Sequence, residues 1–306
     1  MTQNAKLIAL DWGTTNVRAA LLDGSGHIID QRHGESGVGH HSTTEFEKQF
    51  DDLVHGWADV PAIAAGMIGS RQGWREAAYL PCPASCSDLA DGLFRFDHNN
   101  RAITIVPGLK LETNGRFDVM RGEESQLAGF LSDHPEFDGT IVMPGTHSKW
   151  VTIEKGTIVT FQTYMTGELF EALSSHTILR HSVGASNTST DDFEKTAQEV
   201  ARSSQSFEGS LFAIRAAQLL QGGDPNMLRN QLSARLISAE YKSAIADGFA
   251  VDDPMTLIGD AKLTKLYASV FAAHQKATSC FDGTPFVWTA LFDLATKAGL
   301  IGRAAA

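Results

Sequence analysis

A pattern of three strands near the N-terminus constrains the fold of this chain most, because it is repeated. An apolar, strand-like run at residues 7–10 leads into a polar turn, and strand-like runs follow at 17–22 and 27–32. The first turn contains Gly13, and Gly24 lies in the hairpin turn between the second and third runs. The unit is therefore strand, polar turn, strand, hairpin turn and strand.

The same unit returns near the middle of the chain. Strand-like runs lie at 141–143, 149–153 and 157–163, with Gly145 and Gly156 in the two turns. Each of these glycines follows its counterpart in the first unit by 132 residues. We interpret the repeat as an internal duplication with one copy in each of two domains. The chain has 306 residues, which agrees with two domains of roughly 100–200 residues.

The boundary between the domains is expected near the start of the second unit, which gives domains at 1–134 and 135–306. The last helix, at about 286–300, is predicted to pack back toward the first domain, with Gly299 as its C-terminal cap. The other predicted elements are strands at 62–67, 103–106 and 255–258, a polar loop at 69–74, helices at about 119–131, from 166, around 228–239 and at 263–274, and a loop with at most one short helix at 182–206.

Charge and cysteine content narrow the class of protein. The formal net charge is −11 and no basic run occurs, so nucleic acid and anionic membrane surfaces are poor partners. The N-terminus lacks the basic start and apolar stretch of a signal peptide, and no apolar stretch approaches the roughly 20 residues of a membrane span. The three cysteines, Cys82, Cys86 and Cys280, are typical of a reducing compartment. We expect a cytoplasmic protein, and the sequence leaves open whether it is a monomer or a homodimer.

Six segments resemble the 2-dehydro-3-deoxygalactonokinases, a family within the superfamily of sugar kinases, actin and the Hsp70 ATPase. Their shared order over nearly the whole chain makes the resemblance specific. The segments are LIALDWGTTNVRAAL (7–21), GMIGSRQGW (66–74), YLPCPAS (79–85), DVMRGEESQLAG (118–129), MPGTHSKWV (143–151) and MTGELF (165–170). The resemblance implies an α/β fold of two ribonuclease H-like, actin-like ATPase domains, with ATP bound in a cleft between them.

The two Gly-Thr turns are the candidate phosphate-binding loops. Glycine lets backbone N–H groups approach a phosphate, and threonine hydroxyls add further donors. The resemblance assigns this role to Gly13, Thr14 and Thr15 in the first domain, and to Gly145, Thr146 and His147 in the second. The alternative is a pair of ordinary hairpin turns, which the symmetric recurrence disfavours.

Asp11 ends the first strand just before its turn. A carboxylate repels a phosphate unless a cation lies between them, so we predict that Asp11 holds Mg²⁺ directly or through water. The second copy has Met143 at this place, so the carboxylate is specific to the first domain. An ordinary aspartate at the end of a strand is the alternative. Glu123 is a second candidate for the metal site, although the helix dipole alone also favours acidic residues such as Glu123 and Glu124 near a helix start.

Asp118 precedes the predicted helix at 119–131. It resembles the aspartate with which similar kinases accept the proton of the sugar hydroxyl, and we predict that it is the catalytic base. The alternative is a helix N-cap, because aspartate at this position accepts backbone N–H bonds.

A sugar acid carries a carboxylate, so its site needs hydrogen-bond donors. Ser70, Arg71 and Trp74 lie in the loop after a predicted buried strand, a common place for binding groups. Arginine binds a carboxylate with two parallel hydrogen bonds. Arg121 and Lys149 are further candidates for the substrate, and Lys149 is also a candidate phosphate ligand. The alternative for Arg71 is a surface ion pair.

The adenosine is predicted to lie at Gly259 and Asp260, after the strand at 255–258. The family generally has two adjacent glycines here, so Asp260 is a departure that could crowd the nucleoside.

The predicted function is transfer of the ATP γ-phosphate to the 6-hydroxyl of 2-dehydro-3-deoxy-D-galactonate in galactonate catabolism. The alternatives are a kinase of another sugar acid or amino sugar, an actin-like ATP-binding switch without a sugar substrate, and a protein that only binds nucleotide.

Overall fold

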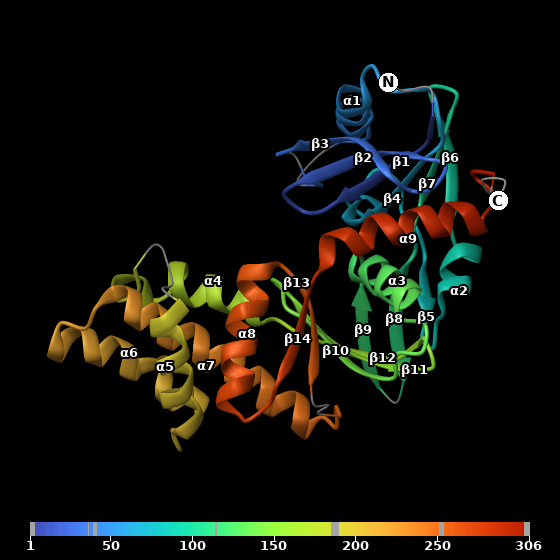
Figure 1. The fold of residues 1–306 in the computed structure, drawn as a ribbon. Helices are drawn as coiled ribbons and strands as arrows, with labels where there is room; N and C mark the ends of the chain where they lie inside the picture. The colour runs from blue at the N-terminus through green and yellow to red at the C-terminus, as the bar shows by residue number, and fades with distance from the viewer. Residues whose placement is uncertain are drawn as a thin grey trace. The chain divides into compact units, whose positions relative to one another are not determined.

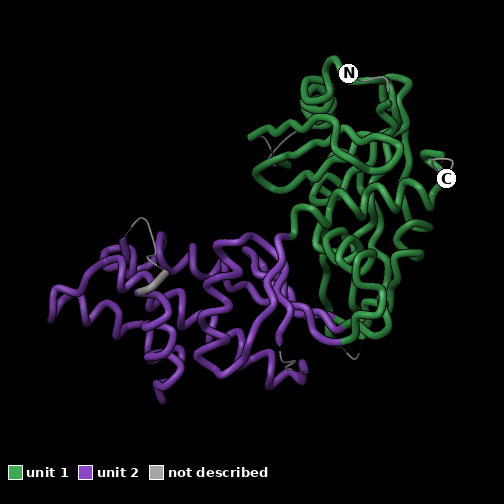
Figure 2. Tube along the Cα trace, viewed as in Figure 1, with its two compact units in different colours: residues 1–138, 153–160, 283–306 green, residues 139–152, 161–282 purple. Residues whose placement is uncertain are grey.

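The computed structural model describes residues 4–35, 37–38, 42–113, 115–184, 190–250 and 254–302. The chain divides into two compact units (Figure 2). Unit 1 contains residues 1–138, 153–160 and 283–306, and unit 2 contains residues 139–152 and 161–282. The first change of unit, after residue 138, lies close to the boundary expected at 134, and the C-terminal residues from 283 onward are part of unit 1.

The main sheet of unit 1 has the strand order β3-β2-β1-β4-β7-β6 (Figure 1). Its strands are β1 Ala5–Trp12, β2 Val17–Asp23, β3 Ile28–Gly34, β4 Ala62–Gly66, β6 Phe94–His98 and β7 Arg101–Ile105. β1, β2 and β3 are antiparallel neighbours, and β4 and β7 continue the sheet in parallel to β1. Leu7 to Leu10 are at most 1% exposed, so this central strand is covered on both faces. That burial explains an apolar run without alternation.

The sheet of unit 2 repeats this order as β12-β11-β10-β13-β14. Its strands are β10 Gly139–Met143, β11 Ser148–Glu154, β12 Thr157–Tyr164, β13 Met255–Gly259 and β14 Thr278–Asp282. The hairpin end of β11 and β12, residues 153–160, belongs to unit 1. β13 and β14 lie parallel to β10, as β4 and β7 lie parallel to β1. The predicted duplication is therefore confirmed, and it extends beyond the three strands visible in the sequence.

Helices of unit 1 pack around its main sheet and beside a smaller sheet. The helices are α1 Thr43–Val54, α2 Cys86–Asp91, α3 Glu123–Asp133 and α9 Gly283–Lys297, with the short 3-10 helix η1 Met67–Gly69. The smaller sheet has the order β5-β8-β9, with β5 Tyr79–Pro81, β8 Gly108–Thr113 and β9 Arg116–Met120. α9 lies along α3 (Figure 1), where the rings of Phe130 and Phe286 meet edge to face at 5.5 Å.

Unit 2 adds a group of helices after its strands. They are α4 Thr166–His176, α5 Thr190–Arg202, α6 Phe207–Gln221, α7 Pro225–Ala246 and α8 Ala261–Ala273, with the 3-10 helix η2 Ile178–His181. Asp224 begins α7, where its carboxylate accepts the N–H of Met227 at 2.9 Å, and Pro225 occupies the first helical position.

Two sequence predictions change in this fold, and one hairpin is new. The helix expected from 119 begins at Glu123, because Val119 and Met120 belong to β9, which pairs with β8. The segment expected to be mainly loop at 182–206 contains α5, whose Phe193, Ala197 and Val200 are buried in the core of unit 2. The β6–β7 hairpin was not predicted, although its turn residues Asn99 and Asn100 both have positive φ angles, as a two-residue hairpin turn requires.

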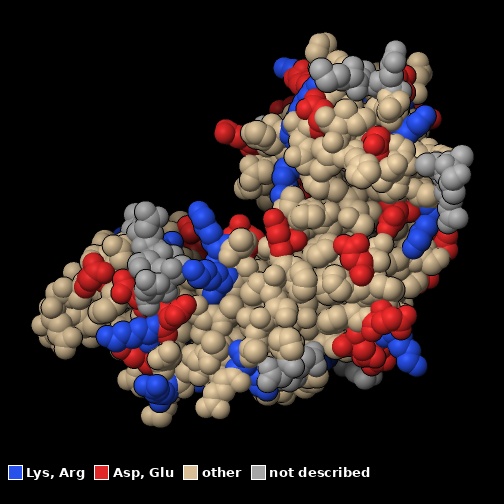
Figure 3. All heavy atoms as spheres, viewed as in Figure 1, with Lys and Arg blue, Asp and Glu red and all other residues tan. Residues whose placement is uncertain are grey.

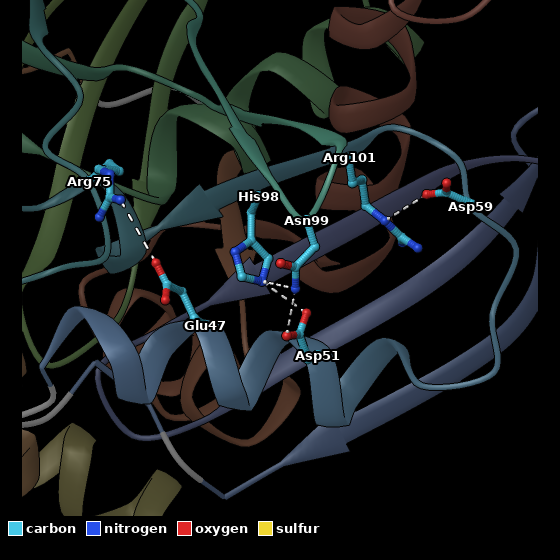
Figure 4. Close-up of polar contacts among 7 residues, drawn as sticks. All are labelled: Glu47, Asp51, Asp59, Arg75, His98, Asn99 and Arg101. Carbon is cyan, nitrogen blue, oxygen red and sulfur yellow. Dashed lines mark hydrogen bonds and ion pairs between the residues drawn. The ribbon is translucent and has the colours of Figure 1, made fainter.

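Polar contacts fasten α1 to the tip of this hairpin (Figure 4). The carboxylate of Asp51 lies 2.9 Å from His98 Nε2, and its other oxygen accepts Asn99 Nδ2 at 3.1 Å. The His98 ring also contacts two aromatic rings, that of Trp74 at 5.2 Å and that of Phe50 in α1 at 5.9 Å between ring centres. The end of the loop at 69–74 is therefore held from two sides.

Three further properties of the chain concern its surface charge, its helices and its cysteines. Acidic and basic side chains are interspersed over the face drawn in Figure 3. Within the described residues, no helix has the length and apolar character needed to cross a bilayer. Cys82, Cys86 and Cys280 are free thiols, and burial raises the pKa of Cys82 to about 11.

Gly129→Ala tests the packing of α9 on α3. A Cβ atom at Gly129 would overlap the carbonyl oxygen of Phe286. Alanine gains about 1 kcal/mol over glycine in a helix interior, but the overlap outweighs that gain. We expect the free energy of unfolding to fall by about 1–3 kcal/mol in urea denaturation.

Gly302→Ala is the control for this variant, because among the described residues no atom beyond its chain neighbours lies within 4 Å of its added Cβ. It should change stability by less than about 0.5 kcal/mol. Equal stability of the two variants would contradict the close packing of α3 and α9.

Candidate functional site

The second Gly-Thr turn, in unit 2, rests on the first turn of α4. The backbone N–H of Glu168 donates to the carbonyl oxygen of Thr146 at 3.0 Å. A Cβ atom on Gly167 would lie 2.5 Å from the carbonyl oxygen of Gly145 and 2.7 Å from the Cα of Thr146. Because real Cβ atoms do not approach so closely, glycine is needed at 167 to let the two backbones meet.

Side chains next to this turn are also held. His147 Nε2 lies 2.5 Å from Glu168 Oε2, which is a second link to α4. Lys149 Nζ donates to the carbonyl oxygen of His147 at 3.0 Å. Lys149 is only 3% exposed, so its ammonium group adds positive charge beside the turn from within unit 2.

A pocket of about 500 Å³ opens beside the turn. Its walls are largely apolar, and Arg229 covers the Phe170 ring at 4.6 Å while donating to the carbonyl oxygen of Gly184. The pocket is lined by Gly145, Thr146, Thr166, Gly167, Phe170, Glu171, Arg229, Ser233, Leu236, Ile237, Leu263, Leu266 and Tyr267. Apolar walls with a few polar groups are typical of small-molecule sites.

Asp260 acts as a helix cap. Its Oδ1 accepts the N–H groups of Lys262 and Leu263 at 2.9 and 3.1 Å, which begins α8. Neither Gly259 nor Asp260 lines the pocket, whereas α8 contributes Leu263, Leu266 and Tyr267. The sequence reasoning missed these wall residues, because their apolar spacing also fits a helix that only packs in the core.

The first Gly-Thr turn, in unit 1, borders a pocket of about 480 Å³. The N–H of Gly13 donates to the carbonyl oxygen of Asn16 at 2.9 Å, which closes the turn. Arg18 donates to Asp11 Oδ2 at 2.5 Å and to Thr284 Oγ1 at 2.9 Å. The lining residues are Asp11, Gly13, Thr15, Asn16, Val17, Arg18, His33, Gly34, Glu35 and Gln126. The described part of the chain holds no cluster of three or more His, Cys, Asp or Glu suited to a metal.

The loop at 69–74 combines a buried core contact with an exposed arginine. Ser70 is 4% exposed, and its hydroxyl has no hydrogen-bond partner among the described residues. Trp74 is 3% exposed and packs against Phe96 at 5.0 Å, so its side chain anchors the loop in the core. Arg71 is exposed. Contact of these three residues with a substrate stays a prediction.

The start of α3 lies near the end of β4 and contains a buried acid. A Cβ atom at Gly122 would lie 3.4 Å from the Cα of Gly66. Arg121 is 8% exposed, donates from Nη2 to the carbonyl oxygen of Ala77 at 2.7 Å, and its backbone N–H donates to Glu123 at 3.1 Å. Glu124 is fully buried, and its carboxyl accepts the N–H of Gly122 at 2.6 Å.

Burial raises the pKa of Glu124 to about 8, and the neighbouring charge of Glu123 acts in the same direction. The sequence singled out Asp118 instead, since burial of a carboxyl cannot be read from residue type. Glu124 is therefore a further candidate acid or base beside Asp118, because its own pKa lies near neutrality.

Asp118 lies within β9, opposite Leu111 of β8. Its Oδ1 accepts the N–H of Val119 at 2.8 Å. The alternative reading of Asp118 as a helix cap is wrong, because α3 begins at Glu123 with Gly122 as its N-cap. Its role as a base stays a prediction.

Comparison with known proteins decides the family. Residues 11–294 match the sequence model of the family described as 2-keto-3-deoxy-galactonokinase. The chain belongs to the 2-keto-3-deoxy-galactonokinase family. A family member of Rhizobium meliloti (strain 1021), named as a 2-dehydro-3-deoxygalactonokinase, is 34% identical over 316 residues, covering 100% of this chain and 99% of that protein. The 2-dehydro-3-deoxygalactonokinase of Escherichia coli (strain K12) is 34% identical over 271 residues, covering 88% and 90%.

Solved structures agree with this family and with the predicted fold. A crystal structure from Sinorhizobium meliloti, assigned as a 2-dehydro-3-deoxygalactonokinase, has a TM-score of 0.86 and 32% identity, and covers 94% of this chain and 95% of that one. The activator of 2-hydroxyisocaproyl-CoA dehydratase from Clostridium difficile has a TM-score of 0.53 at 11% identity, covering 98% and 99%. The second likeness shows the fold alone, and it confirms the predicted actin-like α/β fold class.

Glu124→Gln tests the buried acid at the start of α3. The folded carboxyl holds its proton up to about pH 8, while an ordinary glutamate in the unfolded chain loses it near 4.5. The stability linked to this proton is therefore present at low pH and is lost as the pH rises between these values. Relative to the variant, the wild-type free energy of unfolding should fall with a slope of up to about 1.4 kcal/mol per pH unit.

Urea denaturation at several pH values between 5 and 9 measures this difference, with Glu136→Gln at an exposed position as the control. A wild-type-minus-variant difference that stays constant with pH would contradict the raised pKa of Glu124.

Proposed function

We propose that the protein is a sugar-acid kinase that transfers the γ-phosphate of ATP to the 6-hydroxyl of 2-dehydro-3-deoxy-D-galactonate. The observation that carries the proposal is the pocket of unit 2. Its walls are largely apolar, and it is bordered by the second Gly-Thr turn, where Gly145 leaves room for a ligand next to the backbone. A nucleotide suits this combination, because its base is flat and largely apolar while its phosphates need N–H donors. The names of the relatives in R. meliloti and E. coli supply the acceptor.

The nucleoside is proposed to bind against α7 and α8, with its phosphates at Gly145, Thr146 and His147. α8 begins directly after Gly259 and Asp260, and Asp260 caps the helix that forms this wall. The Asp260 carboxylate already accepts two N–H groups at the start of α8. Its side chain is therefore directed at the helix and does not need the nucleoside as a partner. The predicted crowding by Asp260 is therefore not part of the proposal.

The turn of unit 1 is proposed to bind phosphate through Gly13, Thr14 and Thr15. The pocket beside it is lined by residues whose side chains carry oxygen atoms, the ligands that Mg²⁺ prefers: Asp11, Thr15, Asn16, Glu35 and Gln126. Asp11 also pairs through Oδ2 with Arg18, which lines the same pocket. This donor set fits Mg²⁺ held by Asp11, with Glu123 as the second predicted ligand. Bound Mg²⁺ would neutralise phosphate charge during transfer.

The sugar acid is proposed to bind through Ser70, Arg71, Trp74 and Arg121, with Lys149 of unit 2 at its carboxylate or at a phosphate. Ser70 supports this assignment, because its buried hydroxyl lacks a partner among the described residues. Asp118 is proposed to accept the proton of the 6-hydroxyl as that oxygen attacks the γ-phosphorus and ADP leaves. A cytoplasmic location stays a prediction from the sequence.

A substrate panel tests the proposed function. The purified protein is incubated with Mg-ATP and each of several keto-deoxy sugar acids, and formation of ADP and of phosphorylated acid is measured. We expect ADP formation only with added acid, fastest with 2-dehydro-3-deoxy-D-galactonate, and phosphate on its 6-position by NMR. ADP release that does not depend on any sugar acid would contradict the proposal and favour a switch ATPase.

Asp118→Asn tests the proposed base. General-base removal lowers turnover by about 10²–10⁴-fold, whereas binding of Mg-ATP measured by titration calorimetry should not change. Glu124→Gln is assayed beside it, since its pKa near neutrality also suits a base. Wild-type turnover in Asp118→Asn would remove this residue from the role, and a selective loss in Glu124→Gln would transfer the role to Glu124.

A further inference from the structure

A buried carboxylate lies behind the wall of the unit 2 pocket. Glu240 of α7 is 4% exposed and does not line the pocket. Trp150 Nε1 donates to its Oε1 at 2.9 Å, and the Tyr267 hydroxyl donates to its Oε2 at 2.6 Å. The side chains of Thr166 and Ser148 also interact with it and lower its pKa. One acid therefore has partners from three separate elements.

These partners compensate for the burial of the acid. Burial raises the pKa of Glu240, and the interactions with Thr166, Tyr267, Trp150 and Ser148 act in the opposite direction. Loss of the carboxylate would leave several buried donors without an acceptor, and unsatisfied buried groups are costly. The partners are therefore held at fixed positions around Glu240.

The same partners form or flank the pocket. Tyr267 and Thr166 line it from α8 and from the first position of α4. Ser148 follows the Gly-Thr turn directly, is fully buried, and its hydroxyl lies 2.7 Å from that of Tyr267. Glu240 thus links the residue after the turn, the helix on which the turn rests and a side chain of the opposite wall.

We propose that Glu240 is a positioning residue for the nucleotide, which preforms the pocket by fixing Tyr267, Thr166 and Ser148. This inference rests on the proposed function. Because Glu240 lies outside the pocket lining, its effect on a ligand passes through the residues that it holds.

Glu240→Gln tests the proposal with little change in volume. The amide replaces one acceptor oxygen by an N–H donor, which then faces a donor of the network. We expect the Kd for Mg-ATP to rise about tenfold or more by titration calorimetry. The KM for the sugar acid should change less than the Kd for Mg-ATP, because Ser70, Arg71 and Arg121 of unit 1 lie outside the network. Tyr267→Phe removes the hydroxyl shared by Glu240 and Ser148, and should raise the Kd in the same way.

Ser238→Ala is the matched control. Ser238 is 3% exposed, and its hydroxyl lies 2.8 Å from His274 Nε2, so this variant also removes a hydrogen bond between α7 and the end of α8. Its Tm should fall to a similar extent, but its Kd for Mg-ATP should equal that of the wild type.

Each outcome decides between the two claims. Wild-type affinity for Mg-ATP in both Glu240→Gln and Tyr267→Phe would overturn the positioning role alone. An equal loss of affinity in Ser238→Ala would overturn it as well, by showing a general loss of stability. A wild-type protein that binds no Mg-ATP would instead overturn the proposed function and this inference with it.

Discussion

The contact between the Gly-Thr turn and the first turn of α4 fixes one wall of the pocket in unit 2. The carbonyl oxygen of Gly145 and the Cα of Thr146 lie where a side chain at residue 167 would stand. The N–H of Glu168 donates to Thr146, so the turn is held by a directional bond as well as by close packing. A turn fixed in this way would offer its N–H groups to the proposed phosphate without first having to be ordered. Glu240, the buried acid behind the pocket, is proposed to fix Tyr267 of the α8 wall in a similar way.

The two halves of the chain share a topology but differ in chemistry. Both sheets place a Gly-Thr turn after their central strand, with two strands parallel to it on one side and the next two strands of the chain on the other. In unit 1, β6 adds a sixth strand beyond β7. Asp11 is the penultimate residue of β1, whereas Met143 is the last residue of β10. Unit 2 instead has α4, α7 and α8 around its turn, and these helices form a pocket with apolar walls. The proposed division of work follows, with the metal and acceptor in unit 1 and the nucleoside in unit 2.

The sequence predicted the strands of both repeats because their signals are local. Apolar runs, a Gly-Thr turn and a hairpin glycine lie within about thirty residues of each other, and each copy supports the other. Prediction failed where distant contacts decide. Val119 and Met120 fit a helical pattern, but pairing with β8 makes them a strand. The raised pKa of Glu124 depends on burial, and the pocket walls depend on helices that meet only in the folded chain. Asp260 could have been recognised, since aspartate before an apolar helix is a capping signal.

Equilibrium binding of Mg-ATP to Gly167→Ala is the most direct test of the clamped turn. Gly209→Ala is its control, because Gly209 also lies in the first turn of a helix of unit 2, and its added Cβ meets only the Ser206 hydroxyl, at 3.1 Å. If the turn binds the phosphates from its position on α4, Gly167→Ala should lose at least about tenfold in affinity, or about 1.4 kcal/mol, while Gly209→Ala binds as the wild type does. Unchanged affinity in a folded Gly167→Ala protein would show that the phosphates are held elsewhere.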